Sequence, residues 1–117
     1  MTSRRAPKRL QDALSACNDL VMFTSGRSLE DYSTEKGLRL IVERLFEILG
    51  EALNHAANDD PSLEHEIPDL RGIVGMRNQL IHGYWDIRDD VVWDTILQDI
   101  PQLRSRLATI IEERGWS

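Results

Sequence analysis

The stretch of residues 38–56, LRLIVERLFEILGEALNHA, decides the fold of this chain of 117 residues. Its apolar side chains recur every three or four residues, a spacing that gathers them on one side of an α-helix. The buried face is predicted to consist of Leu38, Ile41, Val42, Leu45, Ile48, Leu49, Ala52, Leu53 and Ala56. Glu43 and Glu47 fall on the opposite, solvated face. We therefore predict a helix from about Thr34 to about Ala57.

Helices are also predicted before this stretch and after it. An N-terminal helix carries Pro7 in its first turn and ends before Gly26. Ser28-Leu29-Glu30-Asp31 has the pattern of a capping box, and residues 58–62 form a loop. Three later helices are predicted. The first runs from Pro68 or Asp69 to Gly83, and the last runs from Pro101 to about Glu113. Between them, a helix begins at Asp89 or Asp90, and its inward side is predicted to consist of Val92, Trp93, Ile96, Leu97 and Ile100.

The fold class follows from this pattern. No run of alternating polar and apolar residues is long enough to predict a strand. Residues 1–117 are therefore predicted to form a single all-α domain, an up-and-down four-helix bundle with short additional helices. Residues 1–6 are expected to be flexible.

The net charge of −6, from 14 basic and 20 acidic residues, limits the functions open to the chain. Broad adhesion to nucleic acid normally needs a basic face. A nucleic-acid enzyme of this charge would have to concentrate positive charge in one cleft. The candidates are Arg4, Arg5, Lys8, Arg9, Arg71, Arg77 and His82. Alternatively, the acidic surface serves a basic protein partner.

The single cysteine, Cys17, excludes an intramolecular disulfide and fits a reducing cytoplasm, where we expect the protein to be. At its helical position a small buried hydrophobe is favoured over a nucleophile. No apolar run approaches the roughly 18 residues of a membrane span, and the N-terminus lacks the apolar stretch of a secretory signal.

Arg77 lies where a plain helix would place a hydrophobic residue, near the midline of the face formed by Leu70, Ile73, Val74, Leu80 and Ile81. A permanent cation there is costly unless it is paired or faces a cleft that anions enter. His82 and Tyr84 follow about one turn later. Because arginine and histidine suffice for metal-free phosphodiester chemistry, residues 77–84 are predicted to form an active site.

No metal or cofactor is expected. The residues that could suggest a metal site are His55, Glu64, His65 and Glu66. Their spacing matches no standard zinc pattern.

Residues 67–84, IPDLRGIVGMRNQLIHGY, resemble the signature of HepT-like proteins in the HEPN superfamily. The resemblance continues through Asp90-Val91-Val92-Trp93 and Asp99-Ile100-Pro101. Upstream, Gly50-Glu51-Ala52 resembles an element of the family's long second helix. The similarity thus covers most of the chain from that helix to Pro101.

This resemblance implies a dimeric four-helix-bundle ribonuclease toxin that works without metal. Its usual partner is a minimal nucleotidyltransferase antitoxin, which silences the toxin by transferring AMP to the motif tyrosine, here Tyr84. The catalytic residues would be Arg77 and His82, together with Asn78, the polar residue between them, which we expect to position phosphate or ribose. Some family members lack nuclease activity.

The residue types agree with this chemistry. An imidazole can take a proton from a ribose 2′-hydroxyl or give one to the leaving 5′-oxygen, and His82 supplies it. The guanidinium of Arg77 offers a planar fork of donors to the five-coordinate phosphate transition state. In-line attack by the 2′-hydroxyl would leave a 2′,3′-cyclic phosphate and a 5′-hydroxyl.

The spacing of the motif predicts a dimer. Arg77 and His82 are five residues apart, so their Cβ directions differ by about 140° on an ideal helix. By contrast, Arg71, Gly75, Asn78 and His82 share one stripe, on which Gly75 leaves room for a second backbone. We infer that this stripe packs against its twin across a two-fold axis and places two motifs around one cleft. One histidine could then act as base and the other as acid.

Structural alternatives remain for several of these residues. Arg77 could be a buried structural cation paired with Asp12 or Glu51, and His82 could simply cap its helix. In the functional interpretation, Asp12 and Glu51 orient Arg77 or polarise the site; otherwise they are surface charge. Tyr84 could pack its ring on the bundle. Trp85 could stack on a base or fill an interface, and the N-terminal basic cluster could be a tail or an RNA contact.

Two other classes of function remain open. The chain could be a catalytically inactive HEPN module that binds a nucleotide or a protein partner through the same cleft, or a purely structural helical adaptor.

Overall fold

The computed structural model describes residues 5–82 and 87–116, and these residues form helices and connecting turns without a strand. The helices are α1 (Arg5–Thr24), α2 (Leu29–Thr34), α3 (Lys36–Asp59), α4 (Leu63–Glu66), α5 (Leu70–Ile81), α6 (Asp89–Asp94), the π-helical turn η1 (Thr95–Asp99) and α7 (Ile100–Glu113). The predicted all-α fold is confirmed.

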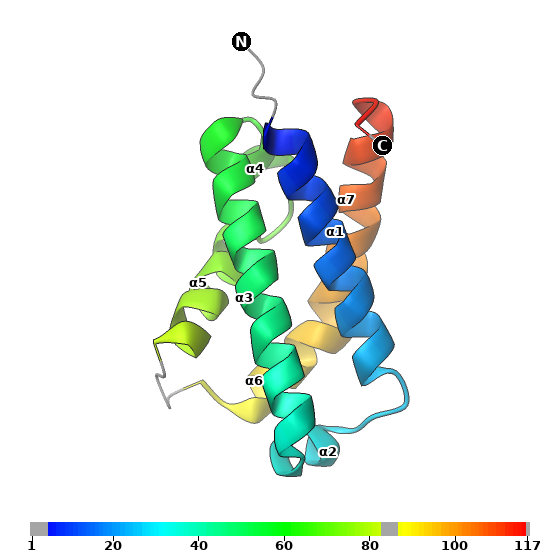
Figure 1. Cartoon of the computed structure of the whole chain (residues 1–117), viewed down its shortest axis with the longest axis vertical. Coiled ribbons are helices and arrows are strands. Elements are labelled where there is room, and N and C mark those ends of the chain that lie inside the picture. The colour runs from blue at the N-terminus through cyan, green and yellow to red at the C-terminus, as the bar shows by residue number, and fades with distance from the viewer. Residues whose placement is uncertain (1–4, 83–86, 117) are drawn as a thin grey trace.

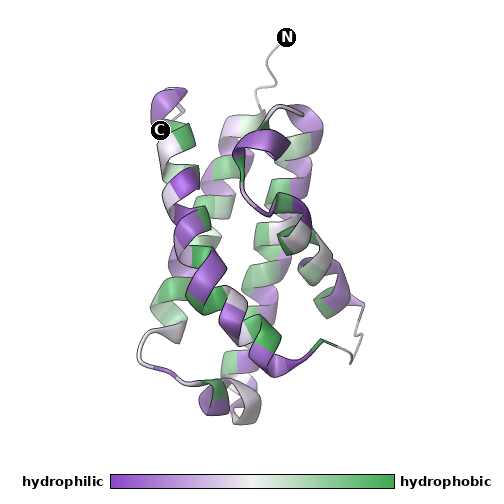
Figure 2. Cartoon of the chain, turned by 180° about the vertical axis from the view of Figure 1, so that it is seen from behind, coloured by the Kyte–Doolittle hydropathy of each residue, from purple (hydrophilic) through white to green (hydrophobic). Residues whose placement is uncertain are grey.

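Four long pieces make the bundle, and α3 lies at its centre (Figure 1). α1 packs on α3 and on α7, while α5 packs on the other side of α3. α6, η1 and α7 follow one another without a break and form the fourth piece. Seen from behind, the helices carry hydrophobic and hydrophilic residues on different sides, as amphipathic helices of a bundle do (Figure 2).

The core is continuous through these helices. Phe46, Leu49 and Leu53 of α3 are fully buried. At the α2 end of the bundle the Tyr32 ring stacks on Trp93, with ring centroids 5.7 Å apart, so Trp93 is a core residue as predicted. Cys17 is also buried, as predicted, and burial raises the pKa of its thiol to about 12.

The capping box predicted at Ser28 is confirmed. Ser28 Oγ accepts a hydrogen bond from Asp31 N at 3.1 Å, and Ser28 N donates to Asp31 Oδ2 at 2.9 Å. This cap starts α2, a separate short helix, so the long helix begins at Lys36 rather than near Thr34.

The expected flexible N-terminus requires a correction. α1 already begins at Arg5, and Ala6 is fully buried. Residues 5 and 6 are therefore part of the bundle, because the small Ala6 side chain continues the apolar stripe of α1. Residues 1–4 lie outside the described part of the chain.

The predicted break at Pro101 is a π-helical turn instead. Proline has no N–H to donate, and the Ile100 N–H bonds to Thr95 O five residues back rather than four. The wider turn keeps Ile96 and Ile100 buried but leaves Leu97 54% exposed, so the prediction that Leu97 points inward is wrong. Ile41, predicted on the buried face of α3, is also exposed.

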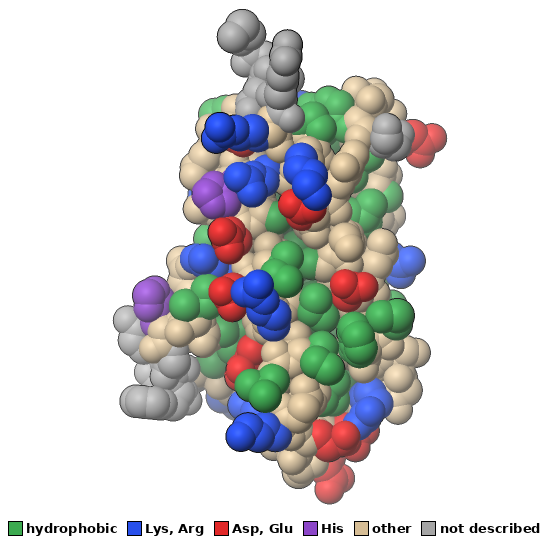
Figure 3. Space-filling view, viewed as in Figure 1, with side chains coloured by type: hydrophobic (Ala, Val, Ile, Leu, Met, Phe, Trp, Pro, Cys, Tyr) green, Lys and Arg blue, Asp and Glu red, His purple; other side chains and the backbone are tan. Residues whose placement is uncertain are grey.

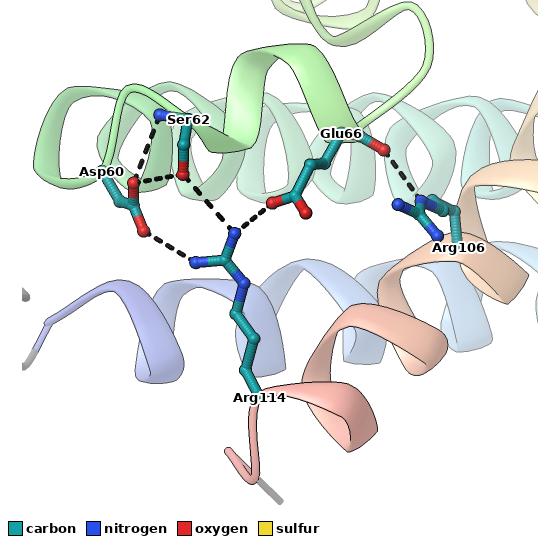
Figure 4. Close-up of polar contacts among 5 residues, drawn as sticks. All are labelled: Asp60, Ser62, Glu66, Arg106 and Arg114. Carbon is teal, nitrogen blue, oxygen red and sulfur yellow. Dashed lines mark hydrogen bonds and ion pairs between the residues drawn. The ribbon is translucent and has the colours of Figure 1, made fainter.

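Arg114 ties the segment between α3 and α5 to the end of α7 (Figure 4). Its Nη1 donates to Asp60 Oδ2 at 2.9 Å, and its Nη2 bonds to the Glu66 carboxylate. Arg106 Nε adds a bond of 2.9 Å to Glu66 O. Residues 60–66 are thus held against α7, and this fixes the place from which α5 starts.

Within the described residues, no helix is both long and apolar enough to cross a membrane.

Replacing Asp60 tests this connection through its pH dependence. Hydrogen bonds from Ser62 and then Arg114 lower the pKa of Asp60. Because the folded-state pKa is the lower one, the stabilisation is present above the ordinary value near 3.9 and is lost as pH falls through the folded value. We expect Asp60→Asn to reduce the free energy of unfolding by about 1 kcal/mol at pH 7 and by progressively less as pH falls below about 3.9.

Urea unfolding at pH 7 and below about pH 3.9 measures this difference. Asp59→Asn, which changes the neighbouring carboxylate at the end of α3, is the matched control. Equal stability of wild type and Asp60→Asn at pH 7 would show that the Arg114 contact contributes nothing.

Candidate functional site

The side chain of Arg77 lies between α5 and α3. Leu70, Ile73 and Val74 bury the same side of α5, and Arg77 itself is half-buried, so its predicted place on the apolar face is confirmed. The apolar face is less buried towards the end of the helix, where Ile81, expected to be buried, is 42% exposed. α5 therefore packs firmly through its first two turns and presents its last turn to solvent.

The Arg77 guanidinium is bound by its neighbour rather than by a carboxylate. Nη1 donates to Asn78 Oδ1 at 2.7 Å. Nε is buried and has no hydrogen-bond partner within the described residues. Such an unmatched buried donor costs about 1–3 kcal/mol, which a purely structural arginine would be expected to avoid.

The predicted partners of Arg77 make other contacts. Asp12 accepts from Lys8 Nζ at 2.6 Å, one turn away on α1. Glu51 lies 3.8 Å from His55 Nε2 on α3. Among the described residues, neither carboxylate pairs with Arg77, and the alternative of a structural ion pair to Asp12 or Glu51 is therefore wrong.

Asn78 connects Arg77 to His82. Asn78 is exposed, and its backbone oxygen accepts from the His82 N–H at 3.1 Å, so the two residues follow one another on the same side of α5. His82 is the exposed residue that ends the helix. The long Arg77 side chain reaches from the α3 side to Asn78, which lies one helical turn before His82.

The predicted stripe of Arg71, Gly75, Asn78 and His82 is exposed along its whole length. A Cβ placed on Gly75 would meet nothing within 4 Å, so this part of α5 is open to a second molecule.

Arg71 is directed away from the end of the helix that carries His82. Its Nε donates to Glu64 Oε1 at 2.6 Å, and its Nη1 donates to Asn54 Oδ1 at 3.3 Å. The Arg71 hydrogen bond lowers the pKa of Glu64. Arg71 thus joins α5 to α3 and α4 and does not contact Arg77 or Asn78.

Two surface hollows lie on the α3 side of the molecule. One, of about 310 Å³, lies between α1 and α3, and Arg9, Asp12, Asp19, Arg44 and Glu51 are among its lining residues. The other, of about 290 Å³, is lined by Leu40, Glu43, Arg44, Glu47, Leu80 and Ile81. Neither hollow is lined by Arg77, Asn78 or His82, although Leu80 and Ile81 at the end of α5 line the second.

Charge on this face is mixed. Acidic, basic and hydrophobic side chains are interspersed over α1 and α3 (Figure 3). Lys8, from the predicted basic cluster, is paired with Asp12, and Arg9 lines the α1–α3 hollow beside acidic residues. Lys8 and Arg9 therefore lie among carboxylates of α1 and α3, while Arg4 of the same cluster lies outside the described residues.

Gly83, Tyr84 and Trp85 lie outside the described residues, so the roles predicted for Tyr84 and Trp85 stay predictions. The structure adds Gly50, whose contact with Arg77 the sequence analysis did not foresee. The sequence did contain a signal for this contact. Glycine lowers helix propensity, and no turn or helix end near residue 50 requires it, so a glycine there indicates close packing of another segment.

Comparison with known proteins gives a consistent result. The family profile described as "Ribonuclease HepT-like" matches residues 13–110. A protein named "Probable ribonuclease HepT" from Thermococcus cleftensis is 36% identical over 97 residues, which are 83% of this chain and 87% of the relative.

Two further relatives carry provisional RNase names. One, from Caldanaerobacter subterraneus, is 31% identical over 104 residues, covering 89% of this chain and 92% of the relative. The other, from Methanocaldococcus jannaschii, is 31% identical over 112 residues, covering 92% and 96%. Comparison with solved structures gives no significant match.

Proposed function

This chain belongs to the HepT-like ribonuclease family, and on that premise we propose that it is a metal-independent endoribonuclease whose catalytic residues are Arg77 and His82. The observation that carries the proposal is the state of Arg77. Its side chain is half-buried and bound by Asn78, and among the described residues no carboxylate neutralises it. A cation held in this way is suited to an anion supplied by the substrate.

The reaction that fits these residues is internal transesterification of RNA. The ribose 2′-oxygen attacks phosphorus, its proton passes to an imidazole, and the bond from phosphorus to the 5′-oxygen breaks. The leaving oxygen takes a proton from an imidazolium, giving a 2′,3′-cyclic phosphate and a 5′-hydroxyl. Arg77 would stabilise the charge on the five-coordinate phosphate, and Asn78 would orient Arg77.

We propose that the active form is a homodimer formed through the exposed stripe of α5. Two-fold packing at Gly75 would bring two copies of His82 to one cleft, so one could act as base and the other as acid. The open space above Gly75 and the exposure of Ile81 support this arrangement.

We also propose that a minimal nucleotidyltransferase is the antitoxin partner and that it transfers AMP to Tyr84. This rests on the resemblance of the motif around Tyr84 to that of the family. AMP on Tyr84 would add a bulky anion two residues along the chain from His82, and we expect it to compete with the RNA phosphate.

Cleavage assays test the catalytic proposal. We expect purified wild type to cleave RNA in the presence of EDTA and to leave 2′,3′-cyclic phosphate ends. His82→Ala should lower the rate by about 10²–10⁴, and Arg77→Ala by about 10²–10³. His55→Ala, which removes a half-buried histidine of α3 from outside the motif, is the matched control and should keep full activity.

Full activity of His82→Ala would refute the assignment. Binding of a nucleotide that raises the melting temperature, without any turnover, would favour the inactive binding module.

Gly75→Glu tests the dimer. The substitution adds bulk and charge to an open position, so the monomer should fold normally while two facing carboxylates oppose association. We expect a monomer in sedimentation experiments and a loss of RNA cleavage. Gly37→Glu, at an equally open position of α3, should remain dimeric and active. A monomeric Gly75→Glu protein that cleaves at the wild-type rate would disprove the shared cleft.

Mass spectrometry tests the modification. With the cognate nucleotidyltransferase and ATP, attack by the Tyr84 phenol on the α-phosphate should release pyrophosphate and leave AMP on the tyrosine. The chain has two tyrosines, and the other, Tyr32, is 1% exposed and serves as an internal control. The adduct should be absent from Tyr84→Phe; an unmodified Tyr84 after complete reaction would count against the proposal.

A further inference from the structure

We propose that Gly50 of α3 is a positioning residue for Arg77, because its bare backbone is the surface on which the arginine stem is held. The inference rests on the proposed nuclease function and extends it to a residue outside the motif. It concerns a helix-interior glycine, a position at which alanine would stabilise an isolated helix.

The contact is very close. A Cβ built on Gly50 would lie 2.6 Å from Arg77 Cγ, 3.3 Å from Arg77 Cδ and closer still to Arg77 Cβ. Real Cβ atoms essentially never approach another atom within 3.0 Å, and the atoms met here belong to the base of the Arg77 side chain, so a methyl group on the buried Gly50 would force the stem or the helix to shift. The three nearest atoms all belong to the Arg77 side chain. Gly50 therefore makes room for the arginine stem itself.

Among the described glycines, Gly50 is the one at which an added Cβ would meet Arg77; at Gly72 it would meet the Asp69 side chain instead. Gly37 lies in the same helix and Gly75 in the same helix as Arg77, yet a Cβ on either would meet nothing within 4 Å. Helix α3 thus contains one glycine at an open position and another, Gly50, at which a methyl group would collide with the proposed catalytic residue.

The packing of the Arg77 stem on Gly50 restricts where the guanidinium can lie. An arginine in solvent samples many rotamers and loses this freedom when it binds a phosphate. Here the stem lies against α3, Nε is enclosed, and Nη1 is bound to Asn78. The side chain is therefore ordered before substrate arrives, which is the condition for strong stabilisation of a transition state.

Gly50→Ala should displace the stem and with it the guanidinium. Since a misplacement of about 1 Å in an active site can cost about 10² in rate, we expect kcat for RNA cleavage to fall about 100-fold. The affinity for RNA, measured with a substrate whose 2′-hydroxyls are replaced by hydrogen, should change much less. Gly37→Ala is the matched control and should leave both quantities unchanged.

A kcat for Gly50→Ala equal to that of wild type would overturn the proposal. An equal loss of kcat in Gly37→Ala would assign the effect to α3 as a whole and would overturn it as well.

A second measurement does not depend on cleavage. In a ¹H–¹⁵N spectrum, the Arg77 Nε–H signal is identified by its disappearance in Arg77→Lys. We expect this proton to exchange slowly in wild type, because Nε is enclosed, and rapidly in Gly50→Ala. If wild type fails to cleave RNA but this difference is found, the nuclease function fails while the positioning by Gly50 stands. Equal exchange in the two proteins would refute the positioning.

Melting temperatures keep the test valid even if Gly50→Ala folds poorly. With Arg77 present, Gly50→Ala should lower the melting temperature because the methyl group meets the stem. In an Arg77→Gly background the opposing atoms are gone, and Gly50→Ala should raise it through helix propensity. The same shift in both backgrounds would show that Gly50 and Arg77 are not coupled and would end the proposal.

Discussion

The packing of the Arg77 stem against Gly50 is the contact through which the fold and the candidate site depend on each other. A side chain of any size at residue 50 would separate the two groups, so α5 can dock on α3 in this way only over bare backbone. The same contact encloses Nε and directs the charged end towards Asn78. The packing of α5 on α3 and the position of the Arg77 guanidinium therefore depend on the same contact.

This arrangement also explains how an acidic bundle tolerates an arginine on an apolar face. The aliphatic stem is buried like a hydrophobic side chain, while the guanidinium reaches the edge of the helix. The unmatched Nε makes the arrangement costly, and the expected carboxylates, Asp12 and Glu51, are engaged elsewhere. The cost is understandable if the cation serves a ligand, as the proposed ribonuclease function requires.

The remaining polar contacts hold α5 in place rather than adding to its charge. Arg114 binds the segment that precedes α5, and Arg71 pairs with Glu64 and Asn54 at the start of the helix. Positive and negative side chains are interspersed over α1 and α3 (Figure 3). Binding of RNA would thus depend on a few cations at a defined place, and a two-fold dimer would double their number there.

The sequence by itself determined the all-α fold, the core face of α3 apart from Ile41, the burial of Trp93 and the family, because these follow from local periodicity and from a contiguous motif. Tertiary structure alone decided the partner of Arg77 and the role of Gly50. Residues 50 and 77 belong to different helices, and no local pattern reports how closely two helices approach. Which side chain a cation binds depends likewise on distances that exist only in the folded bundle.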